Sequence, residues 1–377
     1  MTIEYKSLGL MSGTSGDGID ASIIQSDGEN SYKEIYNKYF KYNQSLFEKI
    51  HFLKEKINKS EDLNTFSKDL DLLERDITLF HATIVEEILK ENNRNVDIIG
   101  FHGQTVFHSQ KLKISKQLGD AKLLSKLSNK KVAYNFRERD LKNGGAGAPL
   151  ASIFHKTLVK QKKLTLPVCI LNIGGISNIT IIKNDNINDV ESRDIGPGNC
   201  LIDEWVRKNS EKNYDLNGSL ASRGKVNKII LEQAQELFSN SEIKHLTSLD
   251  TKDFDVSFAR GLSLEDGAAL MTNFTAQIIS SSLLYFLSSL SIVKCKILVC
   301  GGGRKNNFLI ECIKSHLKNK NEVILEPIEK YNYDGDYIES QAFGYLAIRS
   351  FLKLPISFPN TTGCKKPTIG GKIVKNF

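Results

Sequence analysis

The chain has 377 residues, of which 40% are hydrophobic and 25% are charged, and its formal net charge is +7. This length predicts two domains of moderate size, and the composition is typical of a soluble globular protein. No uninterrupted apolar run approaches the roughly 20 residues that a membrane-spanning helix needs, so we expect no membrane partner. The lysines are spread among acidic and amide residues instead of clustering with arginine and aromatic residues, so we expect no nucleic-acid partner either.

The compartment is suggested by the N-terminus and the cysteines. The opening MTIEYKSLG lacks the basic-then-apolar layout of a secretory signal. The six cysteines have no Cys-x-x-Cys spacing, which favours buried thiols in a reducing compartment over a disulfide framework or a zinc site. These features predict a cytoplasmic protein.

The first predicted elements are two strands, IEYKSLGLM and IDASIIQSD, joined by a short glycine-rich turn into a hairpin. Backbone amides and hydroxyls that converge on an anion predict a phosphate site there. The carboxylates of Asp17 and Asp20 suit such a site only if a divalent cation accompanies the phosphates, and a tight turn with solvated polar residues is the alternative. The candidate residues are Ser12, Gly13, Thr14, Ser15, Gly16, Asp17, Gly18, Ile19 and Asp20.

Helical spacing follows, because apolar residues between Ser60 and Glu91 recur at intervals of three and four. VDIIGFHGQTVFH, residues 96–108, predicts a buried strand that runs into a polar loop. Residues 131–159 predict a strand, a polar loop and then a helix with Pro149 near its first turn.

The opening pattern returns about 160 positions later in LPVCILNIGGISNITIIKND, where Gly174 and Gly175 form the turn. This repeat predicts a domain boundary near Thr165, with domains over residues 1–165 and 166–377, and the last helix and tail could pack back on the first domain. The remaining predicted helices cover residues 200–208, 226–238, 264–287 and 337–352.

The segment SRDIGPGNCLIDEW contains a second candidate phosphate site. Asp194 leaves a strand, Gly196 and Gly198 flank a sharp turn, and Asn199 is expected to cap the helix that starts near Cys200. A helix N-terminus behind glycines suits phosphate, and Asp194 beside it would accept a proton from an attacking oxygen. An aspartate in an ordinary turn is the alternative.

A third glycine-rich turn lies in ILVCGGGRKNNFLIECI, where Gly301, Gly302 and Gly303 link a strand to a helix. Any one of these loops is a weak signal. Two phosphate-type hairpins in matching positions, followed by a strand–glycine–helix turn, predict a nucleotide held between two related domains.

Ten motifs occur in order along the chain: GLMSGTSGDGIDA, HGQTV, QLGDAKLLS, GGAGAPL, LNIGGISNIT, DIGPGNCLIDEW, YDLNGSLASRGKVN, CGGGRKN, ESQAFGYLA and TTG. Through these motifs the chain resembles the anhydro-N-acetylmuramic acid kinase family nearly end to end. This resemblance implies an α/β fold of two actin-like (ribonuclease H-like) domains with an ATP cleft between them. It also implies an enzyme that opens the 1,6-anhydro bridge of the sugar with water and phosphorylates O6, giving N-acetylmuramic acid 6-phosphate and ADP.

The resemblance also assigns roles to residues. It implies that Asp194 is the catalytic base and that the loop from Gly13 to Asp20 holds the ATP phosphates with Mg²⁺, whose ligands stay open. It implies a role in peptidoglycan recycling and a homodimer. The leucine-rich SSSLLYFLSSLSI could supply the dimer surface or be buried in the core.

The sugar-binding residues are less closely specified. The resemblance implies that Glu339 hydrogen-bonds the sugar ring, while His102 and Gln104 either contact the sugar or anchor their own loop. Arg137 or Arg139 would pair with the lactyl carboxylate, since a planar guanidinium binds a carboxylate through two hydrogen bonds. A purely structural salt bridge is the alternative for either arginine.

Two departures from the family pattern bear on these roles. Gly16 stands where the family usually has a bulkier apolar residue, and Glu138 between the two arginines could neutralise one of them. Two other functions also stay open: a kinase of another sugar or sugar acid, and an ATP-driven switch without turnover.

Overall fold

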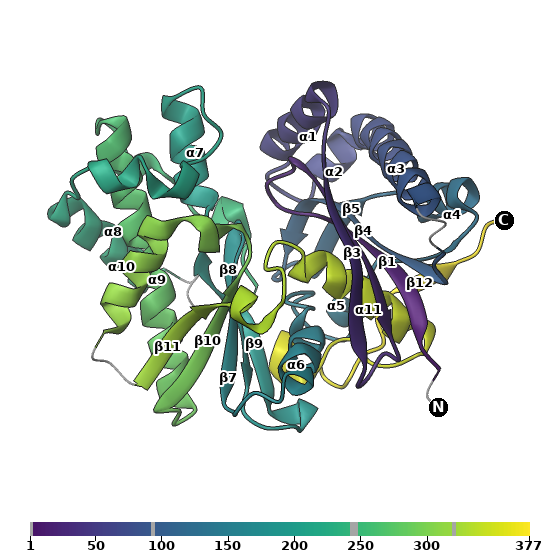
Figure 1. The fold of residues 1–377 in the computed structure, drawn as a ribbon. Coiled ribbons are helices and arrows are strands. Elements are labelled where there is room, and N and C mark those ends of the chain that lie inside the picture. The colour runs from purple at the N-terminus through teal and green to yellow at the C-terminus, as the bar shows by residue number, and fades with distance from the viewer. Residues whose placement is uncertain (1–2, 92–94, 242–247, 319–321) are drawn as a thin grey trace. The chain divides into compact units, whose positions relative to one another are not determined.

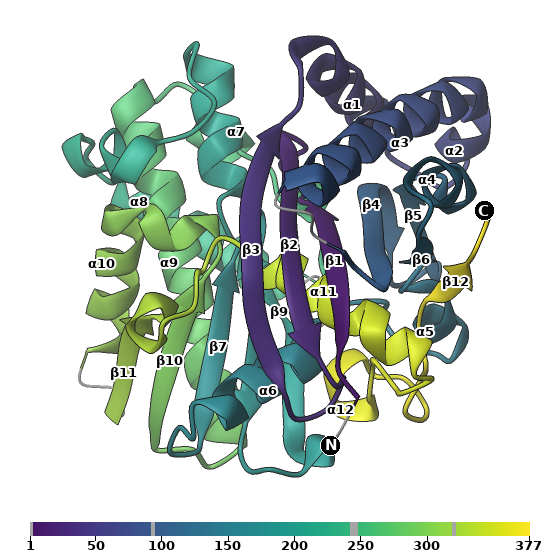
Figure 2. The same ribbon diagram turned by 45° about the vertical axis from the view of Figure 1, so that its right-hand side comes forward.

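The computed structural model describes residues 3–91, 95–241, 248–318 and 322–377, and the chain divides into two compact units (Figures 1 and 2). The first unit comprises Met1–Leu164, Asp185–Val190 and Tyr337–Phe377, and the second comprises Thr165–Asn184 and Glu191–Asp336. The chain therefore leaves the first unit twice and returns to it twice.

The first unit contains a seven-stranded sheet with the order β12-β6-β4-β1-β2-β3, and β5 pairs with β4. Strand β2 is antiparallel to both of its neighbours, β1 and β3, whereas β4 is parallel to β1 and β6 is parallel to β4. The strands are β1 (Tyr5–Ser12), β2 (Gly18–Ser26), β3 (Tyr32–Lys41), β4 (Ile98–Ser109), β5 (Ile114–Leu118), β6 (Lys131–Tyr134) and β12 (Lys372–Val374).

Helix α11 lies directly against this sheet because two strand glycines leave room for it. A Cβ atom at Gly9 would come within 1.9 Å of the Ser340 carbonyl oxygen, and one at Gly100 within 2.3 Å of the Phe343 carbonyl oxygen. The helices of the unit are α1 (Gln44–Lys56), α2 (Asp62–Thr65), α3 (Ser67–Lys90), α4 (Ala121–Ser128), α5 (Glu138–Lys142), α6 (Ser152–Gln161), α11 (Ile338–Phe351) and α12 (Pro359–Thr362).

The second unit contains a five-stranded sheet with the order β11-β10-β7-β8-β9. Strands β7 and β8 form an antiparallel hairpin, while β10 is parallel to β7 and β11 is parallel to β10. This order repeats the β6-β4-β1-β2-β3 part of the first sheet, which confirms the predicted class of two related α/β domains. The strands are β7 (Val168–Ile173), β8 (Ile176–Ile182), β9 (Val190–Pro197), β10 (Lys294–Cys300) and β11 (Glu322–Pro327).

The helices of the second unit follow the sequence prediction to within a few residues. They are α7 (Cys200–Asn209), α8 (Lys228–Asn240), α9 (Leu264–Ser289) and α10 (Asn307–Leu317). In the leucine-rich end of α9, Leu283 and Leu287 are fully buried in the core of this unit, whereas Tyr285 is 70% exposed. Those two leucines therefore pack in the hydrophobic core of the second unit.

Several local predictions for the first unit were wrong. The polar loop predicted at HGQT is part of β4, where Gln104 pairs with Ser12 of β1 on one side and Leu118 of β5 on the other, so the backbone is satisfied in a ladder. The polar loop predicted after β6 contains helix α5, and neither β3 nor α1 was predicted.

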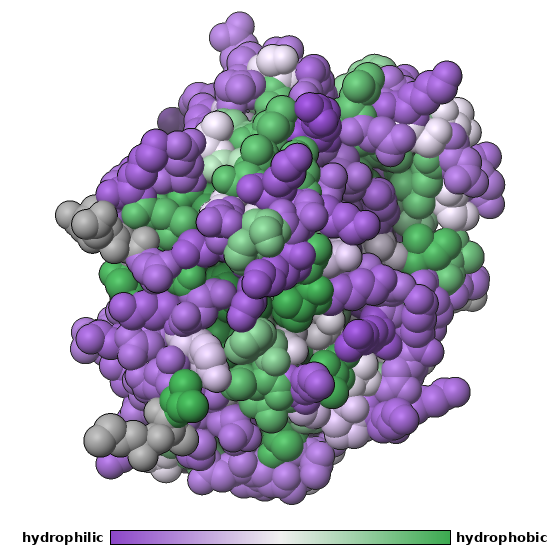
Figure 3. Space-filling view, turned by 90° about the vertical axis from the view of Figure 1, so that its right-hand side faces the viewer, coloured by the Kyte–Doolittle hydropathy of each residue, from purple (hydrophilic) through white to green (hydrophobic). Residues whose placement is uncertain are grey.

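Exposed apolar side chains are spread over many elements of the two units. Among the described residues, no helix has both the length and the apolar character that a membrane crossing requires. On the face drawn in Figure 3, hydrophilic side chains surround separate hydrophobic areas. Exposed large hydrophobic residues such as Phe52, Leu72 and Tyr285 lie on different helices, as is normal for a globular surface.

Candidate active site

The first hairpin turn joins β1 to β2 and has an ordered backbone. The Gly16 amide donates to the Gly13 carbonyl at 3.2 Å, and Gly16 has a φ of +64°, a left-handed conformation that favours glycine. The Ser15 hydroxyl donates to an Asp17 carboxylate oxygen at 2.6 Å. The Lys54 ammonium, from α1, donates to the Thr14 carbonyl, so a cation lies at the tip of the predicted phosphate loop.

A buried network of side-chain hydrogen bonds supports this turn. The Ser12 Oγ lies 2.7 Å from the Tyr42 hydroxyl, 2.7 Å from Gln104 Oε1 and 3.0 Å from the Gly18 carbonyl oxygen. Gln104 Nε2 donates to the Gly13 carbonyl at 3.0 Å. Ser12 Oγ carries a single proton, and Gln104 Oε1 and the Gly18 carbonyl oxygen can only accept, so the Tyr42 hydroxyl, whose pKa burial raises, donates to Ser12 Oγ. Gln104 therefore holds the start of the hairpin turn, and Ser12 links that start to Gly18 at its end.

The predicted hairpin residues differ in solvent exposure and in packing. Thr14, Ser15 and Asp17 are exposed, whereas the Ile19 side chain is fully buried in the core. Gly18 is fixed by packing, because a Cβ atom there would lie 2.5 Å from the Phe40 carbonyl oxygen.

His102 and Arg137 lie together on another part of the first unit. Arg137 Nη2 donates to His102 Nε2 at 2.9 Å, and Arg137 Nη1 donates to the Gly147 carbonyl at 2.8 Å. His102 Nδ1 therefore carries the proton and donates to the Gly103 carbonyl at 2.8 Å. Burial, together with the nearby Arg137 charge, lowers the pKa of His102 well below its usual range, so the ring is neutral and orients Arg137.

The neighbouring charged residues have other partners. The Glu138 carboxylate contacts Lys142 on the next turn of α5 and Lys372 at 2.6 Å, and hydrogen bonds from these two lysines lower its pKa to about 2. Glu138 thus engages lysines, and Arg139 is exposed on the same short helix.

Glu339 lies in the first turn of α11 and is half-buried. The next residue, Ser340, has its hydroxyl 2.6 Å from that of Ser22 on β2. This contact fixes the start of α11, and with it Glu339, to the sheet of the first unit.

Asp194 lies on β9 of the second unit and is 7% exposed. Its Oδ2 accepts a hydrogen bond of 2.8 Å from the Leu249 amide, which orients the carboxylate. The Leu249 contact could not have been foreseen, because a backbone amide more than fifty positions away has no sequence signature.

The second hairpin turn contacts the start of α7 through its backbone. The amides of Gly198 and Cys200 donate to the Gly175 carbonyl at 2.9 and 3.2 Å, and the Asn199 amide donates to the Gly174 carbonyl at 2.8 Å. These three amides therefore already have carbonyl acceptors within the protein. The prediction that the Asn199 side chain caps α7 was wrong, because Asn199 has a helical backbone and its side chain makes no cap hydrogen bond.

The glycines around this turn are mostly required by packing. A Cβ atom at Gly196 would lie 2.5 Å from Ile278 Cγ2, one at Gly301 would lie 2.3 Å from Asn172 Oδ1, and one at Gly303 would lie 2.2 Å from Ile173 Cγ2. Gly302 differs, since its Cβ would meet only the Asn199 side-chain nitrogen, at 3.7 Å. Within the second unit, the structure thus brings Asn199 and Gly302 together at an open position.

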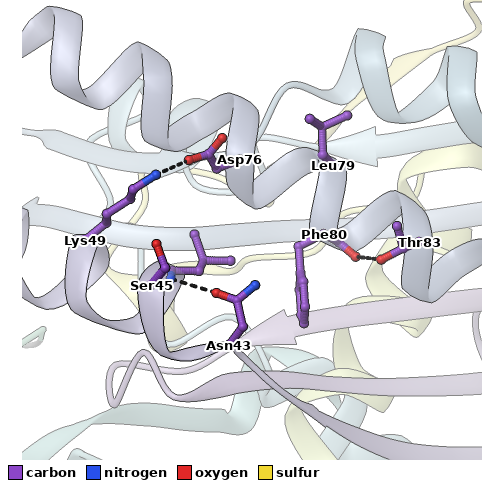
Figure 4. A pocket seen from close by; sticks show the side chains of 8 residues that line it. Asn43, Ser45, Lys49, Asp76, Leu79, Phe80 and Thr83 are labelled. Carbon is purple, nitrogen blue, oxygen red and sulfur yellow. Dashed lines mark hydrogen bonds and ion pairs between the residues drawn. The ribbon is translucent and has the colours of Figure 1, made fainter.

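A pocket of about 320 Å³ lies between α1 and α3 of the first unit (Figure 4). At its rim, Lys49 and Asp76 form an ion pair of 2.8 Å. It is lined by Asn43, Ser45, Leu46, Lys49, Asp76, Leu79, Phe80 and Thr83. None of these eight is a predicted site residue, so this pocket is separate from the candidate site.

Comparison with known proteins decides the family. A family model described as "Anhydro-N-acetylmuramic acid kinase" matches residues 5–376. The chain belongs to the anhydro-N-acetylmuramic acid kinase family. A relative of that name from Pelagibacter ubique (strain HTCC1062) is 54% identical over 373 residues, covering 99% of each chain. Another from Zymomonas mobilis is 37% identical over 375 residues, covering 97% of this chain and 98% of the relative.

Membership in the anhydro-N-acetylmuramic acid kinase family identifies an enzyme, a phosphotransferase. Among solved structures, the activator of the 2-hydroxyisocaproyl-CoA dehydratase from Clostridium difficile with bound ADPNP aligns with a TM-score of 0.42 and 11% identity. That alignment covers 92% of this chain and 96% of the other. The fold assignment rests on the repeated sheet order.

Proposed function

We propose that this enzyme uses ATP and water to convert 1,6-anhydro-N-acetylmuramic acid into N-acetylmuramic acid 6-phosphate and ADP, as a cytoplasmic step in peptidoglycan recycling. The observation that carries the proposal is Asp194, a buried carboxylate whose Oδ2 is oriented by the Leu249 amide in a chain of this family. Oriented carboxylates of this kind serve as general bases.

Asp194 takes a proton from a water molecule whose oxygen then forms a bond to the anomeric carbon. The bond between that carbon and O6 breaks, and its electron pair stays on O6. O6 attacks the γ-phosphorus of ATP, and the bond from that phosphorus to the β,γ-bridging oxygen breaks, which releases ADP. The proton on Asp194 then passes to solvent. One base thus serves both the hydrolysis and the phosphoryl transfer.

The first hairpin turn is proposed to bind the ATP phosphates through the backbone and hydroxyls of Gly13–Asp20. In the second unit, Gly174, Gly175, Gly196, Gly198, Asn199 and Gly301–Gly303 are proposed to contribute to the nucleotide site. Because the amides of Gly198 and Asn199 donate within the protein, we assign the direct contact to the open position at Gly302 and the Asn199 side chain.

The residues present fit a Mg²⁺ ion that arrives with ATP. Among the described residues, no group of three or more histidine, cysteine or acidic side chains could hold a metal ion alone. Mg²⁺ is commonly held by one or two carboxylates together with substrate phosphates, and Asp17 and Asp20 flank the phosphate turn. When bound there, the ion would offset the negative charge of the phosphates.

For the sugar, we propose that Arg137 rather than Arg139 binds the lactyl carboxylate. Its guanidinium is already oriented by His102 and by the Gly147 carbonyl, and a fixed fork loses little freedom on binding. Glu339 is proposed to hydrogen-bond the sugar ring. Gln104 is proposed to support the hairpin instead of contacting the sugar, because its side chain hydrogen-bonds Ser12 and Gly13.

A coupled ADP assay with the anhydro sugar tests the proposal. We expect the wild type to release ADP only when the sugar is present, and Asp194→Asn to lose at least about a thousandfold in kcat while still binding ATP by calorimetry. Asp185→Asn, which makes the same charge change at an exposed position, should retain wild-type activity.

The outcomes separate substrate from mechanism. An ADP release rate that does not depend on the anhydro sugar would overturn the substrate assignment, and other sugars would then be tested. Near-normal activity of Asp194→Asn would leave the substrate in place and overturn the assignment of the base.

A further inference from the structure

Asp140, on helix α5, joins two segments that are far apart in the sequence. Its side chain is fully buried, and its Oδ1 accepts hydrogen bonds from the Ser357 hydroxyl at 2.5 Å and the Thr362 hydroxyl at 2.7 Å. Its Oδ2 accepts from the Gly147 amide at 2.8 Å. We call Asp140, Ser357 and Thr362 the Asp140 cluster.

The loop before Pro149 wraps closely around this carboxylate. A Cβ atom at Gly145 would lie 2.1 Å from Asp140 Oδ2, so only glycine allows the approach. The Ala146 amide donates to the Thr362 carbonyl at 2.7 Å, which adds a backbone contact between the loop and the C-terminal tail. The cluster and the tail together determine where the loop lies.

Gly147 connects the cluster to the Arg137 guanidinium through its peptide groups. The Gly147 amide donates to Asp140, and the Gly147 carbonyl accepts from Arg137 Nη1 at 2.8 Å. A shift of the Gly147 peptide would therefore move the Arg137 guanidinium at Nη1. His102 contacts the guanidinium at the other nitrogen, Nη2.

We propose that the Asp140 cluster is a positioning group that sets the affinity for the carboxylate-bearing part of the sugar by fixing Gly147 and Arg137. This inference rests on the proposed function, and it gives the TTG motif of the C-terminal tail a role in substrate selection. Recognition of a carboxylate by both arms of a guanidinium depends on accurate placement of the fork, and a displacement of about 1 Å can cost about a hundredfold in rate.

The test replaces the Thr362 hydroxyl with a methyl group in Thr362→Val, which conserves shape. We expect the KM for the anhydro sugar to rise about tenfold while the KM for ATP stays within about twofold, since only the loop at Arg137 is disturbed. Thr362→Ser, which keeps the hydroxyl, should restore the wild-type KM. Ser357→Ala removes the second hydroxyl from Asp140 Oδ1 and should act in the same direction.

The matched control is Thr361→Val, at the neighbouring residue. Thr361 is also buried, but its hydroxyl contacts the Phe358 backbone and not Asp140. It should lower the melting temperature at least as much as Thr362→Val while leaving the KM for the sugar unchanged. Thermal denaturation of all the variants separates loss of fold from loss of affinity.

A second ligand distinguishes positioning from general damage. The same anhydro sugar without its lactyl group, 1,6-anhydro-N-acetylglucosamine, should inhibit the wild type and Thr362→Val with equal inhibition constants. Equal weakening of both sugars, or identical KM values for Thr361→Val and Thr362→Val, would overturn the positioning role alone. No sugar-dependent ADP release by the wild type would overturn the proposed function and this inference with it.

Discussion

The two glycine hairpins occupy matching places in their sheets but are supported differently. The β1–β2 turn rests on side chains, because Ser12, Tyr42 and Gln104 form a buried network under it. The β7–β8 turn rests on the backbone, because its carbonyls accept amides from Gly198 to Cys200 at the start of α7. The same topology thus leaves exposed polar residues at the first tip and a turn that is hydrogen-bonded to the start of α7 in the second.

This difference shows that a repeated glycine pattern does not imply a repeated role. In the first hairpin the glycines shape a loop whose tip is exposed, which suits a ligand. Around the second, Gly196, Gly198, Gly301 and Gly303 are required by close packing, whereas Gly174 in the turn and Gly302 have only ordinary contacts beside them. Substitutions should therefore affect the two hairpins in different ways.

The largest effect is expected for Gly198→Ala, between β9 and α7, where the chain contacts the second hairpin. The new Cβ would lie 2.2 Å from the Gly174 carbonyl oxygen, and backbone cannot yield there without breaking the contacts to α7. Overpacking of this kind should lower the free energy of unfolding by about 3 kcal/mol, measured by urea denaturation.

Gly302→Ala is the matched control, since its Cβ would make only an ordinary contact with Asn199. It should leave the free energy of unfolding unchanged within about 0.5 kcal/mol and, if the nucleotide binds there, raise the KM for ATP. Equal destabilisation by the two alanines would mean that the second hairpin is not held by the close approach of Gly198.

A smaller effect is expected for Gln104→Leu under the first hairpin. The Ser12 hydroxyl and the Gly13 carbonyl would each lose a buried partner, which should lower the free energy of unfolding by about 2 kcal/mol. Because the turn is the proposed phosphate loop, ATP affinity measured by calorimetry should fall about tenfold, and sugar affinity much less.

Gln117→Leu provides the comparison for that variant. Gln117 lies on β5 of the same sheet and bonds the side chains of Thr105 and Ser115 instead of the hairpin. If both variants bound ATP equally well, the network would be a support for the sheet and not for the phosphate turn.

Per residue, the smallest effect concerns pH, and it again distinguishes the two units. His81 and His155 are fully buried in the first unit, and burial lowers the pKa of His81 to about 4 and that of His155 to about 3. The folded state keeps both rings neutral, while the unfolded chain takes up protons below about pH 6.5. Stability is therefore lost as pH falls below that value, by about 1.4 kcal/mol per group at pH 5.5.

The chain's single tryptophan, Trp205, lies in the second unit, so its fluorescence reports that unit alone while circular dichroism reports both. Between pH 7.5 and 5.5, the urea midpoint from circular dichroism should fall more than the midpoint from fluorescence. His81→Gln should reduce that gap. A parallel fall of both midpoints in wild type and variant would contradict the unequal acid sensitivity of the units.

Much of the architecture was predictable because it depends on local patterns. The two hairpins and helices α7 to α10 were located from apolar spacing and glycines that lie near one another in the sequence. The supporting contacts were not predictable, because Ser12 and Gln104 are 92 positions apart and Asp140 and Thr362 are 222 apart. Asn199 misled for a physical reason: its backbone is already helical and its amide donates to the Gly174 carbonyl, so its side chain is not placed to cap α7.

The path of the chain through the two units has a consequence for biosynthesis. When the ribosome has added residue 336, every segment of the second unit has been made, whereas the first unit still lacks α11, α12 and β12. Until α11 emerges, the strand surface at Gly9 and Gly100 has no helix to cover it. Nascent proteins usually complete their N-terminal domain first. Here the N-terminal residues belong to the unit that finishes last, so the nascent chain carries an incomplete first sheet through nearly all of its translation.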